Sequence, residues 1–287
     1  MTWQDMTQEE LDAAYDQTVY APNHEQVLAR LADRSAKVRD ILGDPLRFRY
    51  GDRAIESLDV YPAGIDNSPI LIFIHGGTWR FGVAADNAFA ADMYVNAGIN
   101  FVVPDFSSVE DFDGSLEALV AQLQQAVKWV FVHAAEFGGD ASRIYLAGFS
   151  SGAHLAGVLL TCDWSALSLP QDIFKAALLC SGMYDLTPVA HTWRSDYVSL
   201  GPDNIPRLSP QAHPEKFSMP LTVAYGTHES PEFQRQARDF ARTVETAGQD
   251  IRVLVGEGYN HFEIIETLGN PDGVIGRKML HLIRSPG

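Results

Sequence analysis

The chain has 287 residues, of which 46% are hydrophobic, and it carries a formal net charge of −16. This length and apolar content suffice for one large α/β domain or two small ones. The negative charge argues against a nucleic-acid partner, because nucleic-acid-binding proteins need Lys and Arg to displace the counterions around phosphates. It also disfavours anionic substrates, unless a local basic group at the binding pocket overrides it.

The amino-terminal region is predicted to be helical and to carry no targeting signal. Residues 1–20 are polar and acidic and lack the basic start and apolar core of an export signal. No apolar run reaches the ~18 residues of a membrane span, so we expect a cytoplasmic protein with no membrane partner. Helix formers in 8–17 and helically spaced apolar residues in 24–42 predict two helices within residues 1–43. These helices are expected to cap a pocket, to form an oligomer contact or to pack against the sheet.

The pattern then changes to that of strands. Residues 46–50 and 57–61 alternate apolar with polar side chains, which predicts two antiparallel edge strands, each exposed on one face. Residues 70–74 are continuously apolar between Pro69 and Gly76. This run predicts a central strand that is buried on both faces.

The rest of the chain alternates strands and helices. Repeated βα units predict an α/β fold with a mostly parallel central sheet and helices on both faces. No linker or repeat interrupts the pattern, so we expect a single domain over 1–287. The proline-rich stretch 183–217 is too long for a simple connection and predicts a lid or binding loop. The expected elements are helix 88–96, strand 101–103, helix 115–136, strand 143–147, helix 151–161, strand 176–180, strand 221–225, helix 231–247, strand 251–255 and a last helix through 284.

A GxSxG motif lies at 148–152, between a predicted strand and a predicted helix. This strand-turn-helix setting is typical of a nucleophile elbow, in which a sharp turn exposes a serine above the sheet. A β-carbon at Gly148 or Gly152 would strike neighbouring backbone in such a turn. We therefore predict that Ser150 is a nucleophile, whereas an ordinary βα turn with a serine helix cap is the simpler alternative.

The sequence HGGTW at 75–79 directly follows the central strand. Glycines here let backbone N–H groups point at a carbonyl oxygen without side-chain obstruction. We predict an oxyanion hole formed by the N–H groups of Gly76, Gly77 and Ser151. His75 lies at the strand end and suits an orienting hydrogen bond better than the role of base.

The predicted base is His261, in the loop after the last strand. The order serine, acid, histidine along the chain is the order that the α/β-hydrolase fold uses. His154 lies one turn after Ser150, where packing against the sheet is the simpler role. The remaining histidines include two loop candidates of lower rank, His191 and His228, and four that are expected to lie away from the site: His24, His133, His213 and His281.

Two carboxylates compete for the role of acid. Glu229 follows the strand that ends at Tyr225, the usual position of the carboxylate that orients the base. Asp185 follows the preceding strand, where some members of this fold place the acid. We favour Glu229.

No metal or cofactor is predicted. Motifs of His and carboxylates at metal-binding spacing, such as HExxH, are absent. Cys162 and Cys180 are too far apart for a CxxC site and too few for a disulfide framework, so they are expected to be buried thiols. A serine, a histidine and a carboxylate suffice for nucleophilic hydrolysis of a small-molecule substrate.

Five motifs follow one another along the chain: HGGTW at 75–79, GFSSGAHLA at 148–156, SGMYDLTP at 181–188, HESPEF at 228–233 and NHFEIIE at 260–266. Together they resemble the kynurenine formamidase (arylformamidase) family of α/β-hydrolases. The likeness runs nearly end to end, begins with the helix LDAAY at 11–15, and keeps the motifs in the family's order. It implies hydrolysis of N-formyl-L-kynurenine to L-kynurenine and formate, with Ser150 as nucleophile and His261 as base.

One residue, Glu229, departs from the family pattern. The family commonly has Asp where this chain has Glu229, whose extra methylene requires a shift of the loop or the imidazole.

Two aromatic residues suggest how a substrate is held. A formyl group is small, so Trp79 is expected to fill the space that a longer acyl chain needs, and Tyr184 is expected to flank an aromatic leaving group. Packing beneath the loops is the alternative role for both aromatic residues.

Two other functions are also compatible with this sequence. Relatives of the fold hydrolyse plain esters and other amides, so a carboxylesterase for small acyl esters, or a related amide hydrolase, is the main alternative. A non-catalytic binding protein that keeps the fold is the third hypothesis. The family resemblance also makes a homodimer an expectation.

Overall fold

A computed structural model of the protein describes residues 3–285; residues 1–2 and 286–287 of the predicted domain lie outside this range. The centre is an eight-stranded sheet in the order β1-β2-β4-β3-β5-β6-β7-β8. β1 pairs with β2 and β2 with β4 in antiparallel fashion, and every later pair is parallel. The strands are β1 (Leu46–Arg49), β2 (Ser57–Tyr61), β3 (Ser68–Ile74), β4 (Asn100–Pro104), β5 (Gly139–Phe149), β6 (Phe174–Cys180), β7 (Leu221–Gly226) and β8 (Ile251–Gly256).

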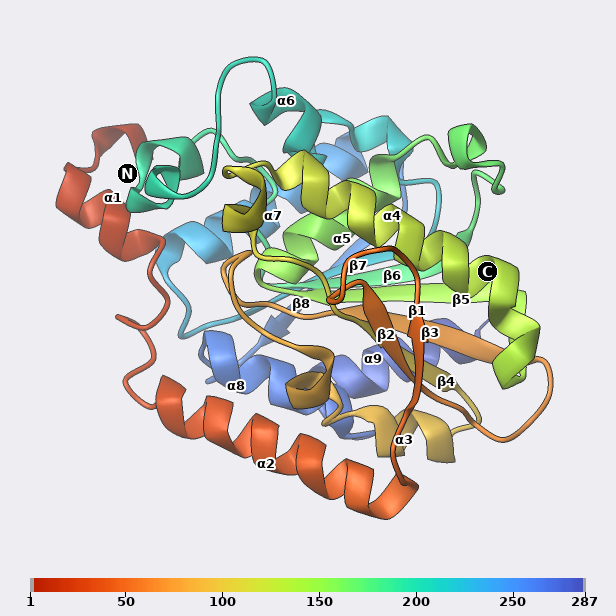
Figure 1. Cartoon of the computed structure of the whole chain (residues 1–287). Coiled ribbons are helices and arrows are strands. Elements are labelled where there is room, and N and C mark those ends of the chain that lie inside the picture. The colour runs from red at the N-terminus through yellow and green to blue at the C-terminus, as the bar shows by residue number, and fades with distance from the viewer. Residues whose placement is uncertain (1–2, 286–287) are drawn as a thin grey trace.

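Helices cover both faces of this sheet (Figure 1). α4, α5 and α7 lie on one face, and α2, α3, α8 and α9 lie on the other. Two buried apolar clusters result, one on each face, and they confirm the predicted α/β architecture. The helices are α1 (Gln8–Ala14), α2 (His24–Leu42), α3 (Ala91–Asn96), α4 (Leu116–His133), α5 (Ser151–Thr161), α6 (Ile205–Leu208), α7 (Pro231–Thr246), α8 (His261–Glu266) and α9 (Val274–Arg284).

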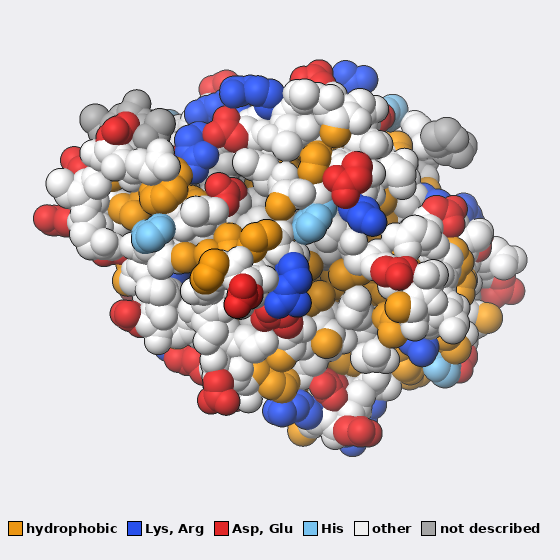
Figure 2. Space-filling model, turned by 90° about the horizontal axis from the view of Figure 1, so that it is seen from above, with side chains coloured by type: hydrophobic (Ala, Val, Ile, Leu, Met, Phe, Trp, Pro, Cys, Tyr) orange, Lys and Arg blue, Asp and Glu red, His pale blue; other side chains and the backbone are white. Residues whose placement is uncertain are grey.

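The central strand β3 explains why the two clusters are separate. Its side chains alternate, so Ile70, Ile72 and Ile74 enter one cluster while Leu71 and Phe73 enter the other. The continuous apolar run therefore supplies both cores, as the sequence predicted. Seen from above in Figure 2, the outer surface instead mixes acidic and basic side chains with small apolar patches.

Two predictions of local structure were wrong. β2 is buried throughout and lies inside the sheet, so only β1 forms the predicted edge. In β2, Leu58 and Val60 enter one cluster and Tyr61 enters the other. The alternation of apolar and polar residues in this strand therefore does not indicate an exposed face. The predicted helix 88–96 also begins too early: a 3₁₀ turn covers Ala84–Asn87, and α3 begins only at Ala91 and then continues to Asn96.

The amino-terminal segment and the stretch 183–217 lie side by side. The stretch holds α6 and several 3₁₀ turns rather than an irregular loop. Asp12 Oδ1 accepts a hydrogen bond from Trp193 N–H at 2.7 Å, and the Gln8 side chain donates to the His191 carbonyl at 2.8 Å. The predicted lid is therefore joined to the start of the chain, and its motion remains a prediction.

Candidate active site

Ser150 stands on a strained turn between β5 and α5. Its backbone has φ 54° and ψ −124°, in a region that side-chain-bearing residues rarely occupy. A β-carbon at Gly148 would lie 2.6 Å from the Gly152 carbonyl oxygen, and one at Gly152 would lie 2.2 Å from that of His75. Neither position has room for a side chain, which is the packing expected of a nucleophile elbow.

Ser150, His261 and Glu229 form one hydrogen-bonded chain. Ser150 Oγ lies 3.0 Å from His261 Nε2, and His261 Nδ1 lies 3.1 Å from Glu229 Oε2. The three side chains lie just beyond the ends of β5, β7 and β8, at the carboxyl edge of the parallel sheet where β6 separates β5 from β7, and all three are buried. The arrangement can take a proton from the serine while a carboxylate holds the imidazole.

The second oxygen of Glu229 is also occupied. Oε1 accepts hydrogen bonds from Ser181 Oγ at 2.6 Å and from Gly226 N–H at 2.7 Å. Ser181 follows β6 directly and has a positive φ of 57°. Sequence reasoning missed this residue, although its place after a central strand, at the start of the SGMYD motif, was a signal.

Asp185, the alternative acid, makes no hydrogen bond to His261 among residues 3–285. Asp185 Oδ1 accepts a hydrogen bond from Thr187 N–H at 2.9 Å, and its backbone N–H and carbonyl bond to Gln236. Among residues 3–285 the carboxylate bonded to His261 is Glu229. The extra methylene of Glu229 is thus accommodated with both of its oxygens bonded.

The 75–79 loop lies next to the serine. A β-carbon on Gly76 would be 3.1 Å from Ser150 Cβ. The Gly77 carbonyl accepts from Arg80 N–H at 2.9 Å and Phe81 N–H at 2.8 Å, which fixes the loop. Ser151 is the first residue of α5, and an N–H in the first turn of a helix has no acceptor within that helix. Gly76 and Gly77 line the same cavity as Ser150, and the oxyanion hole formed by Gly76, Gly77 and Ser151 remains a prediction.

His75 is buried under this loop. Its Nδ1 lies 2.8 Å from the Gly76 carbonyl oxygen, and its ring stacks on Phe106 at 4.6 Å. Burial lowers the pKa of His75, and this effect exceeds the opposing hydrogen bond to Gly76. Within residues 3–285 no hydrogen bond joins His75 to Ser150, and its role in orienting the loop stays a prediction.

A cavity of about 550 Å³ opens beside Ser150 and His261. Its size suits a small organic molecule. Part of its wall comes from the amino-terminal region, including His24, which was expected to lie elsewhere. This position agrees with the cap that was one of the roles considered for the amino-terminal helices. The lining includes Asp16, Gln17, Thr18, Leu28, Leu31, Arg80, Phe81, Phe149, Trp193, Arg194, Phe233, Phe262 and Ile265.

Known proteins are similar to this chain in sequence and fold. Residues 58–174 match the family model described as BD-FAE. Curated kynurenine formamidases from Danio rerio and Salmo salar are 29% and 28% identical, each over 98% of this chain and 98% of the relative. A methylesterase for isoprenylcysteine from Arabidopsis thaliana is 23% identical over 75% of this chain and 56% of that protein.

Solved structures agree on the architecture. A candidate thioesterase from a Silicibacter species superposes with a TM-score of 0.82 at 23% identity, covering 96% of this chain and 99% of the other. An arylesterase superposes with a TM-score of 0.69 at 16% identity, covering 91% and 89%. The chain has the α/β-hydrolase fold. The likeness of this hydrolase to kynurenine formamidases, first seen in short motifs, is confirmed over nearly its whole length.

The two predicted substrate-binding aromatics of the hydrolase do not line the cavity. Trp79 is 1% exposed, and its Nε1–H donates to His154 Nδ1 at 3.1 Å. Tyr184 is fully buried, stacks on Phe240 at 4.3 Å and donates its hydroxyl hydrogen to the Leu179 carbonyl. Both indole and phenol need polar partners when buried, and the core supplies them. Packing beneath the loops therefore describes both residues.

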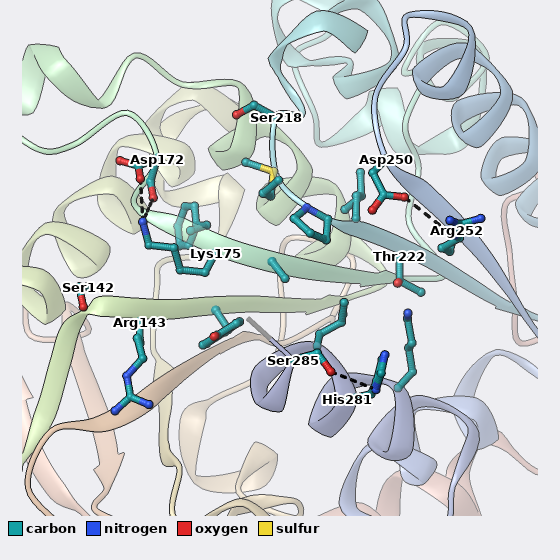
Figure 3. A pocket seen from close by; sticks show the side chains of 18 residues that line it. Ser142, Arg143, Asp172, Lys175, Ser218, Thr222, Asp250, Arg252, His281 and Ser285 are labelled. Carbon is teal, nitrogen blue, oxygen red and sulfur yellow. Dashed lines mark hydrogen bonds and ion pairs between the residues drawn. The ribbon is translucent and has the colours of Figure 1, made fainter. Parts of the chain in front are cut away.

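A larger hollow of about 620 Å³ lies at the opposite end of the sheet (Figure 3). It adjoins the amino ends of β6, β7 and β8 and holds the ion pairs Lys175–Asp172 at 2.7 Å and Arg252–Asp250 at 3.6 Å. Ligands of α/β sheets bind at the carboxyl ends of the strands, where Ser150 lies. The smaller cavity is therefore the candidate active site.

Within residues 3–285, no group of three or more His, Cys, Asp or Glu side chains is placed to hold a metal ion. In the same range, no helix combines the length and apolar character needed to cross a membrane.

Proposed function

We propose that this hydrolase cleaves an aryl formamide, with N-formyl-L-kynurenine as the leading substrate and L-kynurenine and formate as products. The observation that carries the proposal is the hydrogen-bonded series Ser150 Oγ, His261 Nε2, His261 Nδ1, Glu229 Oε2, with contacts of 3.0 and 3.1 Å beside a cavity of about 550 Å³. The near full-length likeness to proteins named kynurenine formamidase supports this choice of substrate.

The reaction proceeds through a formyl-enzyme. His261 Nε2 takes the Ser150 proton as Oγ attacks the formyl carbon, and the N–H groups of Gly76, Gly77 and Ser151 stabilise the resulting oxyanion. The C–N bond breaks and the arylamine leaves with the proton from His261. A water molecule then gives its proton to His261 and attacks the formyl ester, which releases formate and restores Ser150.

Glu229 acts on His261 rather than on the substrate. Its carboxylate accepts from Nδ1–H, so that Nε2 carries the lone pair that Ser150 needs. It also stabilises the imidazolium that forms during attack. The bonds from Ser181 and Gly226 keep this carboxylate in place.

A carboxylesterase for small acyl esters is the second candidate. It is favoured by the same arrangement, since the proposed chemistry applies equally to an ester carbonyl, and by relatives and structures named as esterases. The two functions differ in the acyl and leaving groups that the cavity accepts.

One panel of substrates tests both proposals. We expect the wild type to hydrolyse N-formyl-L-kynurenine with a higher kcat/KM than p-nitrophenyl acetate or butyrate, and Ser150→Ala to lose about 10⁴-fold or more on every substrate. Fluorophosphonate labelling of wild type but not Ser150→Ala serves as the control. A preference for the esters with formamides untouched would replace the first function by the second, and a folded wild type that fails to label would indicate a binding protein.

A further inference from the structure

The candidate cavity holds one buried cation that has no carboxylate partner among the described residues. Arg194 lines the same cavity as Ser150 and His261 and is 4% exposed. Its Nη1 donates to Tyr197 Oη at 2.9 Å and its Nη2 to the Tyr15 carbonyl at 2.7 Å, both neutral oxygens. Its Nε–H is buried and has no hydrogen-bond partner within residues 3–285. A buried guanidinium normally has an anionic partner, because burial of an uncompensated charge is costly.

Aromatic rings surround the guanidinium instead. Its central carbon lies 4.9 Å from the centre of the Trp193 ring and 5.8 Å from that of Trp79. These faces stabilise a cation without neutralising it. The guanidinium is thereby held in one place, in an environment that would strengthen its attraction for an anion.

The second arginine of the cavity provides a contrast. Arg80 forms an ion pair with Glu110 at 2.8 Å, and its side chain is 30% exposed. Its charge is therefore already compensated and partly solvated. Two arginines line the same cavity, and Arg194 is the one left without a carboxylate in the described part of the chain.

We propose that Arg194 binds the carboxylate of the substrate and makes this hydrolase selective for carboxylate-bearing amides or esters. A guanidinium can donate two parallel N–H bonds to a carboxylate, which gives direction as well as affinity. The residue thus overrides locally the bias of a chain with net charge −16 against anionic substrates. The inference deepens the proposed function, since it assumes that Ser150 attacks the molecule that Arg194 holds.

Matched substrate pairs test the proposal. One pair is N-formyl-L-kynurenine and its carboxyl methyl ester, followed by release of the arylamine; the other is 4-acetoxybenzoate and its methyl ester, followed by release of the phenol. We expect wild type to favour the free carboxylate by about 10- to 100-fold in kcat/KM, mainly through KM, in each pair that it cleaves. Arg194→Met should reduce this preference to near unity, and Arg194→Lys should retain part of it.

The neutral esters and Arg80→Met are the controls. Arg194→Met should keep its rate on the methyl esters within a few-fold, whereas Arg80→Met should keep the wild-type ratio between the members of each pair. If wild type treats both members alike, or if Arg194→Met slows both equally, the carboxylate role is overturned and Arg194 is structural. Formamides left uncut while the 4-acetoxybenzoate preference persists would reject the proposed function and support the role of Arg194.

Affinities measured by calorimetry test the role of Arg194 without any need for turnover. L-kynurenine should bind wild type about 10- to 100-fold more tightly than its methyl ester does, and this difference should vanish in Arg194→Met. Equal affinities for wild type would overturn the proposal even if no variant folded.

Discussion

Glu229 divides its two carboxylate oxygens between different partners. Oε2 faces His261, and Oε1 accepts from Ser181 and Gly226. A carboxylate fixed in this way can hold the imidazole tautomer without moving during the reaction. This makes Glu229 the residue whose replacement separates orientation of the base from the attack itself.

We expect Glu229→Ala to lower kcat/KM by about 10³- to 10⁴-fold, because the imidazole loses both its orientation and its counter-charge. Asp185→Ala should stay within about threefold of wild type, since the described contacts of Asp185 are to its own loop and Gln236. Steady-state rates on one substrate decide this comparison. A large loss in Asp185→Ala with Glu229→Ala unaffected would reverse the assignment.

The sequence identified those site residues whose motifs are local. Ser150 and His261 were found because a strained turn and a loop after the last strand leave a pattern within a few residues. Ser181 and Arg194 were missed because their importance depends on what meets them in space, from segments 48 and 179 residues away. Trp79 and Tyr184 were misplaced for the same reason: aromatic character does not tell whether a ring faces a cavity or the core.

Elements far apart in sequence meet at His154, on α5. Nδ1 accepts from the Trp79 indole, so the ring must be neutral with its proton on Nε2, which donates to the Leu208 carbonyl at 2.8 Å. Burial lowers the pKa of His154 to about 4. This residue therefore joins the 75–79 loop, α5 and the stretch 183–217 only while it is uncharged.

The free energy of unfolding should consequently depend on pH. Between pH ~6.5 and ~4 the unfolded chain binds a proton at His154 that the folded protein does not, so stability is retained above this window and falls as pH decreases through it. The loss is about 2 kcal/mol between pH 7 and pH 5. Urea unfolding at the two pH values should give a smaller loss for His154→Gln than for wild type, and equal losses would contradict the role given to this histidine.

The secondary structure was predictable where strand and helix periods alternate clearly, as in β3 and α5. The burial of β2 was not, because whether an alternating strand faces solvent depends on which helices cover it. Nor does any local pattern reveal that Gln17 Nε2 bonds to Ser230 Oγ at 2.8 Å, next to Glu229. The roles of the amino-terminal segment and of 183–217 depend on such contacts.

For the molecule as a whole, the sheet is common to both apolar clusters. Loss of β3 or β5 would expose side chains on both faces at once. The shared sheet supports the prediction of a single domain over 1–287, which was made because no linker interrupts the sequence. The expected homodimer remains a separate prediction, which light scattering would test.

Differential scanning calorimetry should therefore give one transition, with an enthalpy of about 200 kcal/mol at the midpoint for a chain of this size. The calorimetric and van't Hoff enthalpies should agree if unfolding is two-state. Two resolved transitions, or a stable fragment after limited proteolysis between β4 and β5, would argue for two domains.

The bonds made by Oε1 of Glu229 constrain how this sequence can diverge. A shorter aspartate at 229 could keep the Ser181 and Gly226 contacts or reach His261, but the fixed backbone leaves it short of one set. We therefore expect replacement of Glu229 by aspartate to be tolerated only if a second substitution, near residue 181 or 261, moves the backbone to compensate. Divergence between the two acids at this position would then require paired substitutions.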